Sequence, residues 1–214
     1  RPGFDMFQLM AELLELVQLL ATNNGIGIKS INRISYADAF LGAAGIDPHS
    51  ASADDCRRCA SAQGIEQPVG LEDDVDEWLD WLLTQLVIPS FDEDAFTLLY
   101  DYPRTQAALA CLYEDTVGRI VAARFELFFG ATELANGFDE LRDADEQRLR
   151  FERENLRRQS LGMPAAILDD HLIMALQHGL PACSGVALGL DRLLMVLAGE
   201  DLIEHVLAFP FARI

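Results

Sequence analysis

The stretch "ARFELFFGATELANGFDE", residues 123–140, decides the fold because it reads as two strands joined at a glycine. Phe125, Leu127 and Phe129 occupy alternate positions, as residues do when they share one face of a strand. A tight connection at Gly130 would fold the following residues back antiparallel to the first strand. The pattern therefore predicts a hairpin with an apolar face.

Two glutamates are expected together on the other face of this hairpin. When a hairpin loop has an even number of residues, residues that pair across the two strands have position numbers whose sum is odd. The sum for Glu126 and Glu133 is odd, so their side chains should project from the same face of the hairpin. Two exposed like charges placed this way cost up to about 1 kcal/mol, so a compensating charge is expected. Arg124 could supply it as a local ion pair. Alternatively, both carboxylates could hold Mg²⁺, which prefers one or two carboxylates together with phosphate oxygens.

The end of the second strand carries an amide and a carboxylate, Asn136 and Glu140. Asn136 has the wrong parity for the Glu133 face unless the Asn-Gly step forms a bulge, which Gly137 would allow. Together these two groups would suit a ligand ammonium. The alternative is a plain strand exit, in which Asp139 or Glu140 stabilises the next helix.

A second informative stretch is "SGVALGL", residues 184–190, in which Gly185, Ala187 and Gly189 alternate with larger apolar residues. On a strand these small residues share a face, and close approach of a flat ligand would account for a face without side chains. Arg192 follows, where a guanidinium can stack on a ring or reach a phosphate. Close packing of a helix on the sheet explains the same pattern.

The rest of the chain alternates between helical and extended patterns. Residues 22–30 predict a break, and residues 35–64 read as short helices and loops that include the "CRRC" of Cys56 and Cys59. A lone C-x-x-C favours two ordinary thiols over redox or metal chemistry. In the charged helix near residue 150, Leu149, Phe151 and Leu156 are the expected anchors. Helices are predicted over 4–21, 71–90, 143–160, 169–179 and 191–199, and strands over 95–103, 119–130 and 132–138.

Two of these helices carry further signals. Asp5 is available near the start of the first helix. In the helix over 71–90 a core-facing stripe is expected, formed by Trp78, Trp81, Leu82 and Leu86, and its acids mark the solvated face.

Composition limits the class of protein. The chain has 214 residues, of which 50% are hydrophobic, enough for one sizeable domain with a core. A formal net charge of −19 argues against a large nucleic-acid footprint. No apolar run reaches the length of a membrane span. Four cysteines in a chain of this size suit a reducing compartment, which leads us to expect a cytoplasmic protein.

Two motifs carry a family resemblance. "RFELFFGATELANGFDEL", residues 124–141, and "GVALGLDRLLM", residues 185–195, resemble the C-terminal half of a class II lysyl-tRNA synthetase core, with "GLDR" as its motif 3. The closer resemblance, over the whole chain, is to the elongation factor P beta-lysine ligases, which lack an anticodon-binding domain. Lysyl-tRNA synthetases usually have glycine at the place of Ala187, and the ligases resemble this chain there.

The resemblance implies an α+β fold of the class II aminoacyl-tRNA synthetase type, an antiparallel sheet flanked by helices. It implies that Mg²⁺ and ATP activate (R)-beta-lysine as an adenylate, and that a lysine side chain of elongation factor P accepts the acyl group. Lysine itself is the other candidate substrate, and neither tRNA nor a membrane is expected as a partner. The alternatives are a fragment of a class II lysyl-tRNA synthetase and an inactive synthetase-like binding module.

The resemblance also assigns roles to single residues. It places Glu126 and Glu133 on the metal, with Glu133 and Arg192 as the catalytic pair on ATP. It also implies that Leu134 and Gly189 contact the nucleotide. The amino-acid substrate would be bound by Asn136, Glu140 and Ala187.

The resemblance also predicts the domain organisation. Motifs 1 and 2 would lie upstream of Arg1, so residues 1–214 are expected to form the C-terminal part of a catalytic domain, with a helical insertion at about residues 35–90. The resemblance implies a homodimer for the full-length protein and little activity for this part alone.

Overall fold

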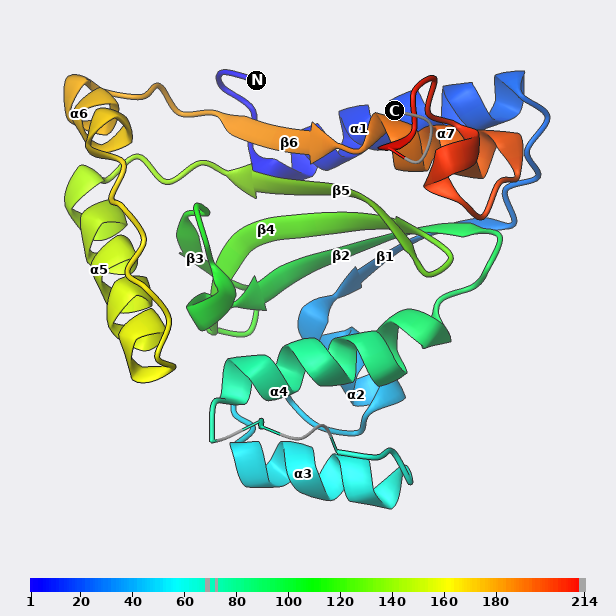
Figure 1. The fold of residues 1–214 in the computed structure, drawn as a ribbon. Helices are drawn as coiled ribbons and strands as arrows, with labels where there is room; N and C mark the ends of the chain where they lie inside the picture. Colours follow the sequence, from blue (N-terminus) through cyan, green and yellow to red (C-terminus); the bar gives the residue numbers. More distant parts are fainter. Residues whose placement is uncertain (68–69, 72, 212–214) are drawn as a thin grey trace.

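A mixed sheet organises the structure, a computed structural model that describes residues 1–67, 70–71 and 73–211. Within these residues six strands form one sheet in the order β1-β2-β4-β5-β6, and β3 pairs with the first part of β4 (Figure 1). The α+β class is confirmed. The strands are β1 (Ser30–Ser35), β2 (Ala95–Pro103), β3 (Leu112–Glu114), β4 (Ile120–Phe129), β5 (Thr132–Asp139) and β6 (Ser184–Leu188).

Helices precede, interrupt and follow these strands. The α-helices are α1 (Met6–Asn23), α2 (Tyr36–Ala43), α3 (Ala53–Ala62), α4 (Val75–Leu82), α5 (Ala144–Ser160), α6 (Asp170–His178) and α7 (Leu190–Ala198). The shorter segments are the π-helix η1 (Leu83–Val87) and the 3-10 helices η2 (Ile88–Ser90), η3 (Arg104–Gln106) and η4 (Ile203–His205). None of the described helices is long and apolar enough to cross a membrane.

The predicted hairpin is present as β4 and β5. Phe129 pairs with Thr132 and Phe128 pairs with Glu133, so Gly130 and Ala131 make the turn. Gly130 has a φ of 52°, and an added Cβ would lie 2.8 Å from the carbonyl oxygen of Glu93. Glycine therefore fits both the backbone conformation and the space available at this turn.

The first strand differs from the sequence prediction. Residues 30–35 follow the predicted break and form β1, which runs parallel to β2 with Ser30 opposite Ala95 and Ser35 opposite Tyr100. The sheet is therefore mixed, whereas a wholly antiparallel sheet was expected. The short sequence "SINRIS" has little strand signal of its own, and it is extended because its backbone pairs with the buried strand beside it.

One face of the sheet is covered by α1, which begins as its sequence predicts. The Asp5 side chain accepts a hydrogen bond from the Gln8 amide at 2.8 Å, and the Gln8 side chain accepts one from the Asp5 amide at 3.0 Å. Such a capping box satisfies backbone donors that a helix start leaves open. The apolar side of α1, including Met10 and Val17, packs against Phe125 and Leu127 of β4.

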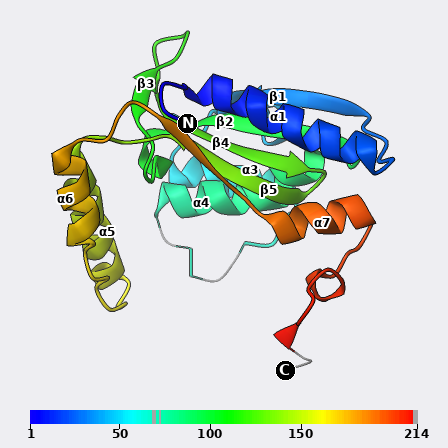
Figure 2. The ribbon, with the colours of Figure 1, turned by 90° about the horizontal axis from the view of Figure 1, so that it is seen from above.

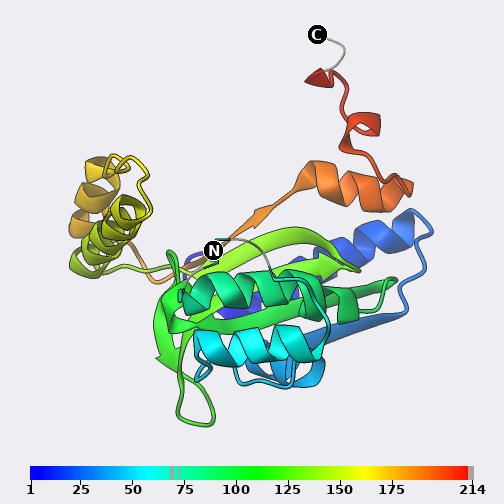
Figure 3. The ribbon, with the colours of Figure 1, turned by 60° about the horizontal axis from the view of Figure 1, so that its bottom comes forward.

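The other face is covered by the helices that occupy the chain between β1 and β2. Figure 3 shows α3 and α4 in front of the sheet and α1 behind it. Trp78 and Leu82 of α4 are buried, as predicted, and they share a core with Phe128 of β4. The helix predicted over 71–90 is shorter, because α4 begins after its Asp74 cap; residue 72 lies outside the described residues.

The last helices lie at opposite ends of the sheet. α5 and α6 are at one end and α7 is at the other (Figure 2). Two of the predicted anchors of α5 are wrong: Leu149 is 45% exposed and Leu156 is 66% exposed, whereas Gln147 is buried. The charged helix therefore has a weak apolar face. Its pairing with the remaining structure is largely ionic, through Arg157 to Asp74 and Glu77.

Candidate active site on the open half of the sheet

The hairpin brings the two predicted glutamates to one face of the sheet. Glu133 lies opposite Phe128, and Phe128 points to the same side as Glu126 two residues away. Past Glu133 the register shifts, and Asn136 then lies directly opposite Glu126. A bulge does bring Asn136 to the glutamate face, but it lies at Leu134. The sequence allowed a bulge at the Asn-Gly step, but Gly137 pairs regularly with Phe125.

Each glutamate has an arginine partner. Arg124 donates to Glu126 Oε1 at 2.6 Å, and the Asn136 amide donates to the same oxygen at 3.3 Å. Arg192 donates to the backbone carbonyl of Glu133 at 2.9 Å and approaches its carboxylate at 3.3 Å. The local ion pair that the sequence left as an alternative is thus present. It does not exclude a cation, because Glu133 keeps 40% of its side chain exposed.

Arg124 is itself held in place. Its guanidinium carbon lies 4.3 Å from the centroid of the Tyr102 ring, and its second terminal nitrogen donates to the Gln106 carbonyl at 3.0 Å. Tyr102 is fully buried, so the cation–π contact is shielded from water. Glu126 is only 8% exposed and therefore has a fixed orientation.

A cavity of about 500 Å³ opens over these glutamates, and we call it the glutamate cavity. It lies between α4, η1 and the β4–β5 turn, and Asp80, Thr84, Glu126, Phe128, Glu133 and Arg192 line it. Among the described residues no group of three or more His, Cys, Asp or Glu is arranged to hold a metal ion. The two carboxylates still fit Mg²⁺ that arrives with a nucleotide, because such an ion takes most of its other ligands from phosphates and water.

The predicted strand face without large side chains is present on β6, and we call this surface, together with the adjoining face of β5, the floor. Val186 and Leu188 pack on the α1 side of the sheet, whereas Ala187 points to the open side and is exposed. Gly189 follows the strand and caps the start of α7. The predicted alternation therefore does not continue to Leu190, which belongs to α7 and is 70% exposed.

A smaller cavity of about 320 Å³ lies over this floor and shares Glu133 and Arg192 with the glutamate cavity. Asn136, Ala187 and Gly189 line it. Leu134 lines it through its backbone, because its side chain is buried on the opposite face with Leu127. The Leu134 carbonyl accepts a hydrogen bond from the Gly189 amide at 2.8 Å, which joins the two strands at this point.

Glu140 lies at the far end of the floor. Its backbone amide donates to the Cys183 carbonyl at 3.0 Å, and one carboxylate oxygen occupies the space beside Gly185 that a Cβ would fill. Partial burial raises the pKa of Glu140, and repulsion from Asp139 raises it further. A carboxylate in this position is suited to receive a cationic group.

One acidic residue beside the site was missed from the sequence. The acids of the 71–90 helix were expected to mark its solvated side, yet Asp80 lines the glutamate cavity. Partial burial raises the pKa of Asp80 to about 6; Arg124 opposes this shift, and Asp76 and Glu126 add to it. The available signal was its place between Leu79 and Trp81, at the border of the apolar stripe of the helix.

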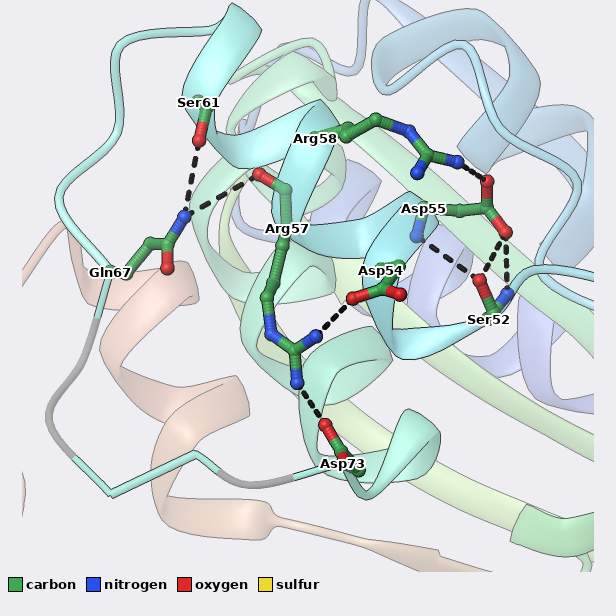
Figure 4. A network of polar contacts seen from close by, with 8 residues as sticks. All are labelled: Ser52, Asp54, Asp55, Arg57, Arg58, Ser61, Gln67 and Asp73. Carbon is green, nitrogen blue, oxygen red and sulfur yellow. Dashed lines mark hydrogen bonds and ion pairs between the residues drawn. The ribbon is translucent and has the colours of Figure 1, made fainter.

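The C-x-x-C segment belongs to α3 and lines neither of these two cavities. Cys56 and Cys59 are buried on α3, and burial raises the pKa of the Cys56 thiol to about 11. The Cys59 thiol donates to the Ala44 carbonyl at 3.2 Å. Figure 4 shows that the intervening Arg57 pairs with Asp54 and Asp73, which ties α3 to the chain entering α4. These features favour ordinary structural thiols.

Comparisons with known proteins agree with the fold. The family described as "tRNA synthetases class II (D, K and N)" matches residues 5–213. The chain therefore belongs to this class II synthetase family. It is also similar to proteins named "Elongation factor P--(R)-beta-lysine ligase", with 42% identity for that of Yersinia enterocolitica serotype O:8 / biotype 1B (strain NCTC 13174 / 8081).

Other similar proteins have the same name. Identity is 41% for the protein of Proteus mirabilis (strain HI4320) and 40% for that of Klebsiella pneumoniae (strain 342). The matches extend over 213 residues, 100% of this chain. The chain spans 63% of the length of each of these relatives.

Proposed function

We propose that the full-length protein is an ATP-dependent ligase that activates (R)-beta-lysine as an adenylate and transfers it to a lysine side chain of elongation factor P. The observation that carries this proposal is the identity of about 40% over the whole chain with proteins of that name. The floor of β5 and β6 is consistent with this proposal. Glutamates and Arg192 lie at one end of the floor, and the separate carboxylate of Glu140 lies at the other end.

The nucleotide end is formed where the two cavities meet. Arg192 would contact the ATP phosphates, and Glu126 and Glu133 would hold Mg²⁺. The ion would supply charge neutralisation for the phosphates during carboxylate attack. Gly189 and the backbone of Leu134 would lie under the nucleotide, where the absence of a bulky side chain permits close approach.

The amino-acid end is formed by Asn136, Ala187 and Glu140. Glu140 follows Glu133 by seven positions, so the two ends are separated by at most about 23 Å of extended chain at roughly 3.3 Å per residue, with Asn136 between them. Asn136 and Glu140 would receive the amino groups of the substrate, and the Ala187 methyl would limit the shape of its pocket. Assembly as a homodimer stays a prediction.

The first test is a competition between acceptors. The full-length protein, at the length of the relatives, is given ATP, Mg²⁺ and (R)-beta-lysine with elongation factor P and tRNA side by side. We expect acyl transfer to the protein and none to tRNA, because the acidic chain disfavours a polyanionic partner. Transfer to tRNA alone would support the synthetase alternative, and no adenylate formation would support an inactive binding module.

The second test separates the two ends of the site. In the full-length protein Glu133→Gln should lower ATP–pyrophosphate exchange by about a hundredfold or more, because a preorganised charge is lost. Glu15→Gln, an exposed glutamate on α1 across the sheet, is the matched control and should leave exchange unchanged. Glu140→Ala should raise the KM for the amino acid by about tenfold or more and leave that for ATP nearly unchanged. Equal effects on both substrates would contradict this division.

A further inference from the structure

A third cavity, of about 600 Å³, lies outside the nucleotide and amino-acid regions described above. It is a cleft between α4, the segment that follows η3, and α5; we call it the α4–α5 cleft. Asp80 lines both this cleft and the glutamate cavity, so the two spaces lie next to each other at this residue. One end of the cleft is therefore beside the phosphate end of the candidate site.

The walls of the cleft are fixed by arginines. Arg150 of α5 donates to the carbonyls of Ala108 and Ala110 at 2.9 and 2.8 Å, which holds the segment after η3 against α5. Arg157 pairs with Asp74 at 2.9 Å, which holds α5 against the start of α4. These contacts fix the walls of the cleft relative to one another, as expected of a preformed binding site.

Asp80 differs from these wall residues because its charge is not matched by an ion pair. In the described part of the chain its hydrogen-bond partner is the neutral Gln106 amide, which donates at 3.0 Å. Arg124 and Arg157 are nearby cations, but the terminal nitrogens of Arg124 already donate to Glu126 and to the Gln106 carbonyl. Arg157 is already paired with acids at the start of α4. Asp80 is accessible in the cleft, so a cation that enters can reach it.

The remaining lining is mixed: charged side chains of both signs, Arg104, Glu146, Arg153 and Glu154, line it together with three large apolar residues. These are Leu109, Leu112 and Phe151, and Asp80 lies where the cleft is next to the glutamate cavity. A lysine side chain has four methylene groups and a terminal ammonium, so it can bury its stem on apolar surface and keep its charge on a carboxylate. A ribose hydroxyl has neither feature.

We propose that the α4–α5 cleft is the route by which the acceptor lysine side chain reaches the activated acid, and that Asp80 receives its ammonium group. This inference rests on the proposed function and identifies the acceptor site. In the transfer the acceptor nitrogen forms the amide bond, the bond between the acyl carbon and the phosphate oxygen breaks, and AMP leaves with that electron pair. The nitrogen gives up two protons in total, which pass to solvent.

The experiment measures the two half-reactions separately in the full-length protein. Asp80→Asn should lower kcat/KM for transfer to the protein acceptor by about ten- to a hundredfold, because a charged partner is lost. Adenylate formation is followed by ATP–pyrophosphate exchange and by trapping with hydroxylamine, a small acceptor that is uncharged near neutral pH. We expect the ratio of protein transfer to hydroxamate formation to fall by the same factor.

Two further variants accompany Asp80→Asn, one as a control for local damage and one as a second test of the cleft. Asp76→Asn changes a carboxylate of the same helix that lines the cleft but is already bonded to the Thr105 hydroxyl at 2.7 Å. It should change that ratio much less than Asp80→Asn. Leu109→Trp adds bulk to the cleft lining without touching Asp80 and should lower protein transfer selectively.

The outcomes distinguish this inference from the proposed function. An unchanged ratio in Asp80→Asn and Leu109→Trp would overturn the inference and leave the ligase function standing. A parallel fall of exchange, trapping and transfer would assign Asp80 to activation and would also overturn it. Absence of exchange in the unaltered protein would instead overturn the proposed function, and the inference with it.

Discussion

The half of the sheet around β2 is covered by helices on both faces, whereas the half around β6 is open on one face. In β2, the adjacent residues Leu98 and Leu99 point to opposite faces and both are fully buried, one under α1 and the other under the α2–α4 helices. In β6, Val186 packs toward α1 while its neighbour Ala187 is exposed. The difference teaches that the binding surface arises where the second helical layer ends, and that small residues keep it open.

The largest effect is expected in the covered half. Leu98→Ala should lower the free energy of unfolding by about 2–5 kcal/mol, because it leaves a cavity between β2 and α1. Leu188→Ala in β6 should cost clearly less, since Leu188 is only partly buried. Urea unfolding of both variants measures this difference. Equal losses would mean that the two halves are equally packed, contrary to the comparison.

Two glycines that lie close together on β5 and β6 sharpen the comparison. A Cβ at Gly137 would strike the buried Phe125 ring and lie 3.0 Å from the Gly185 carbonyl, so Gly137→Ala should cost about 1–3 kcal/mol. A Cβ at Gly185 would strike only the end of the Glu140 side chain, which can move. Gly185→Ala should therefore change stability by less than about 0.5 kcal/mol while raising the KM for the amino acid. The reverse order of stabilities in thermal unfolding would break the comparison.

A smaller effect is expected from the methyl group on the open floor. Ala187→Gly should move substrate preference toward alpha-lysine by about tenfold, because one methyl group in a pocket contributes roughly that much discrimination. Stability should hardly change, since Ala187 is exposed. Exchange rates with alpha- and beta-lysine measure the preference. If their ratio is the same in both proteins, Ala187 does not shape the amino-acid pocket.

The smallest effect is the pH dependence of stability that comes from His49, in the turn between α2 and α3. Partial burial lowers the pKa of His49 from its ordinary 6.5, Arg119 adds to this shift, and Asp47 and Asp115 oppose it. The unfolded chain therefore binds a proton at a higher pH than the folded one, and this histidine destabilises the fold as pH falls through about 6.5. His49→Gln should reduce the loss of stability between pH 7.5 and 5.5, measured by urea unfolding. An unchanged loss would show that other groups cause it.

The parts predicted best from sequence are those with local signals. Alternation predicted β4, β5 and β6, and parity predicted that Glu126 and Glu133 share a face. Asp5 correctly marked the start of α1. Each of these depends on residues within a few positions of one another, so the pattern contains the necessary information.

The parts that were missed depend on distant residues. β1 is extended because of β2, whose first residue, Ala95, pairs with Ser30. Asp80 faces the site because α4 lies across β4, and nothing within its own helix reports that. The bulge at Leu134 was placed at the wrong residue because the register past the turn also depends on β6, where the Leu134 carbonyl accepts the Gly189 amide.

The parallel pairing of β1 and β2 has a consequence for protein engineering. After Ser35 the chain must travel back along the whole sheet before it can start β2 at Ala95 in the same direction. Such a crossover needs about a dozen residues or more, whereas an antiparallel pair can be joined by a short turn. A module that replaced the α2–α4 segment would therefore need this span as well as an apolar face to cover Leu99 and Phe128. A minimal version with a tight turn there would have to reverse β1 or release it from the sheet.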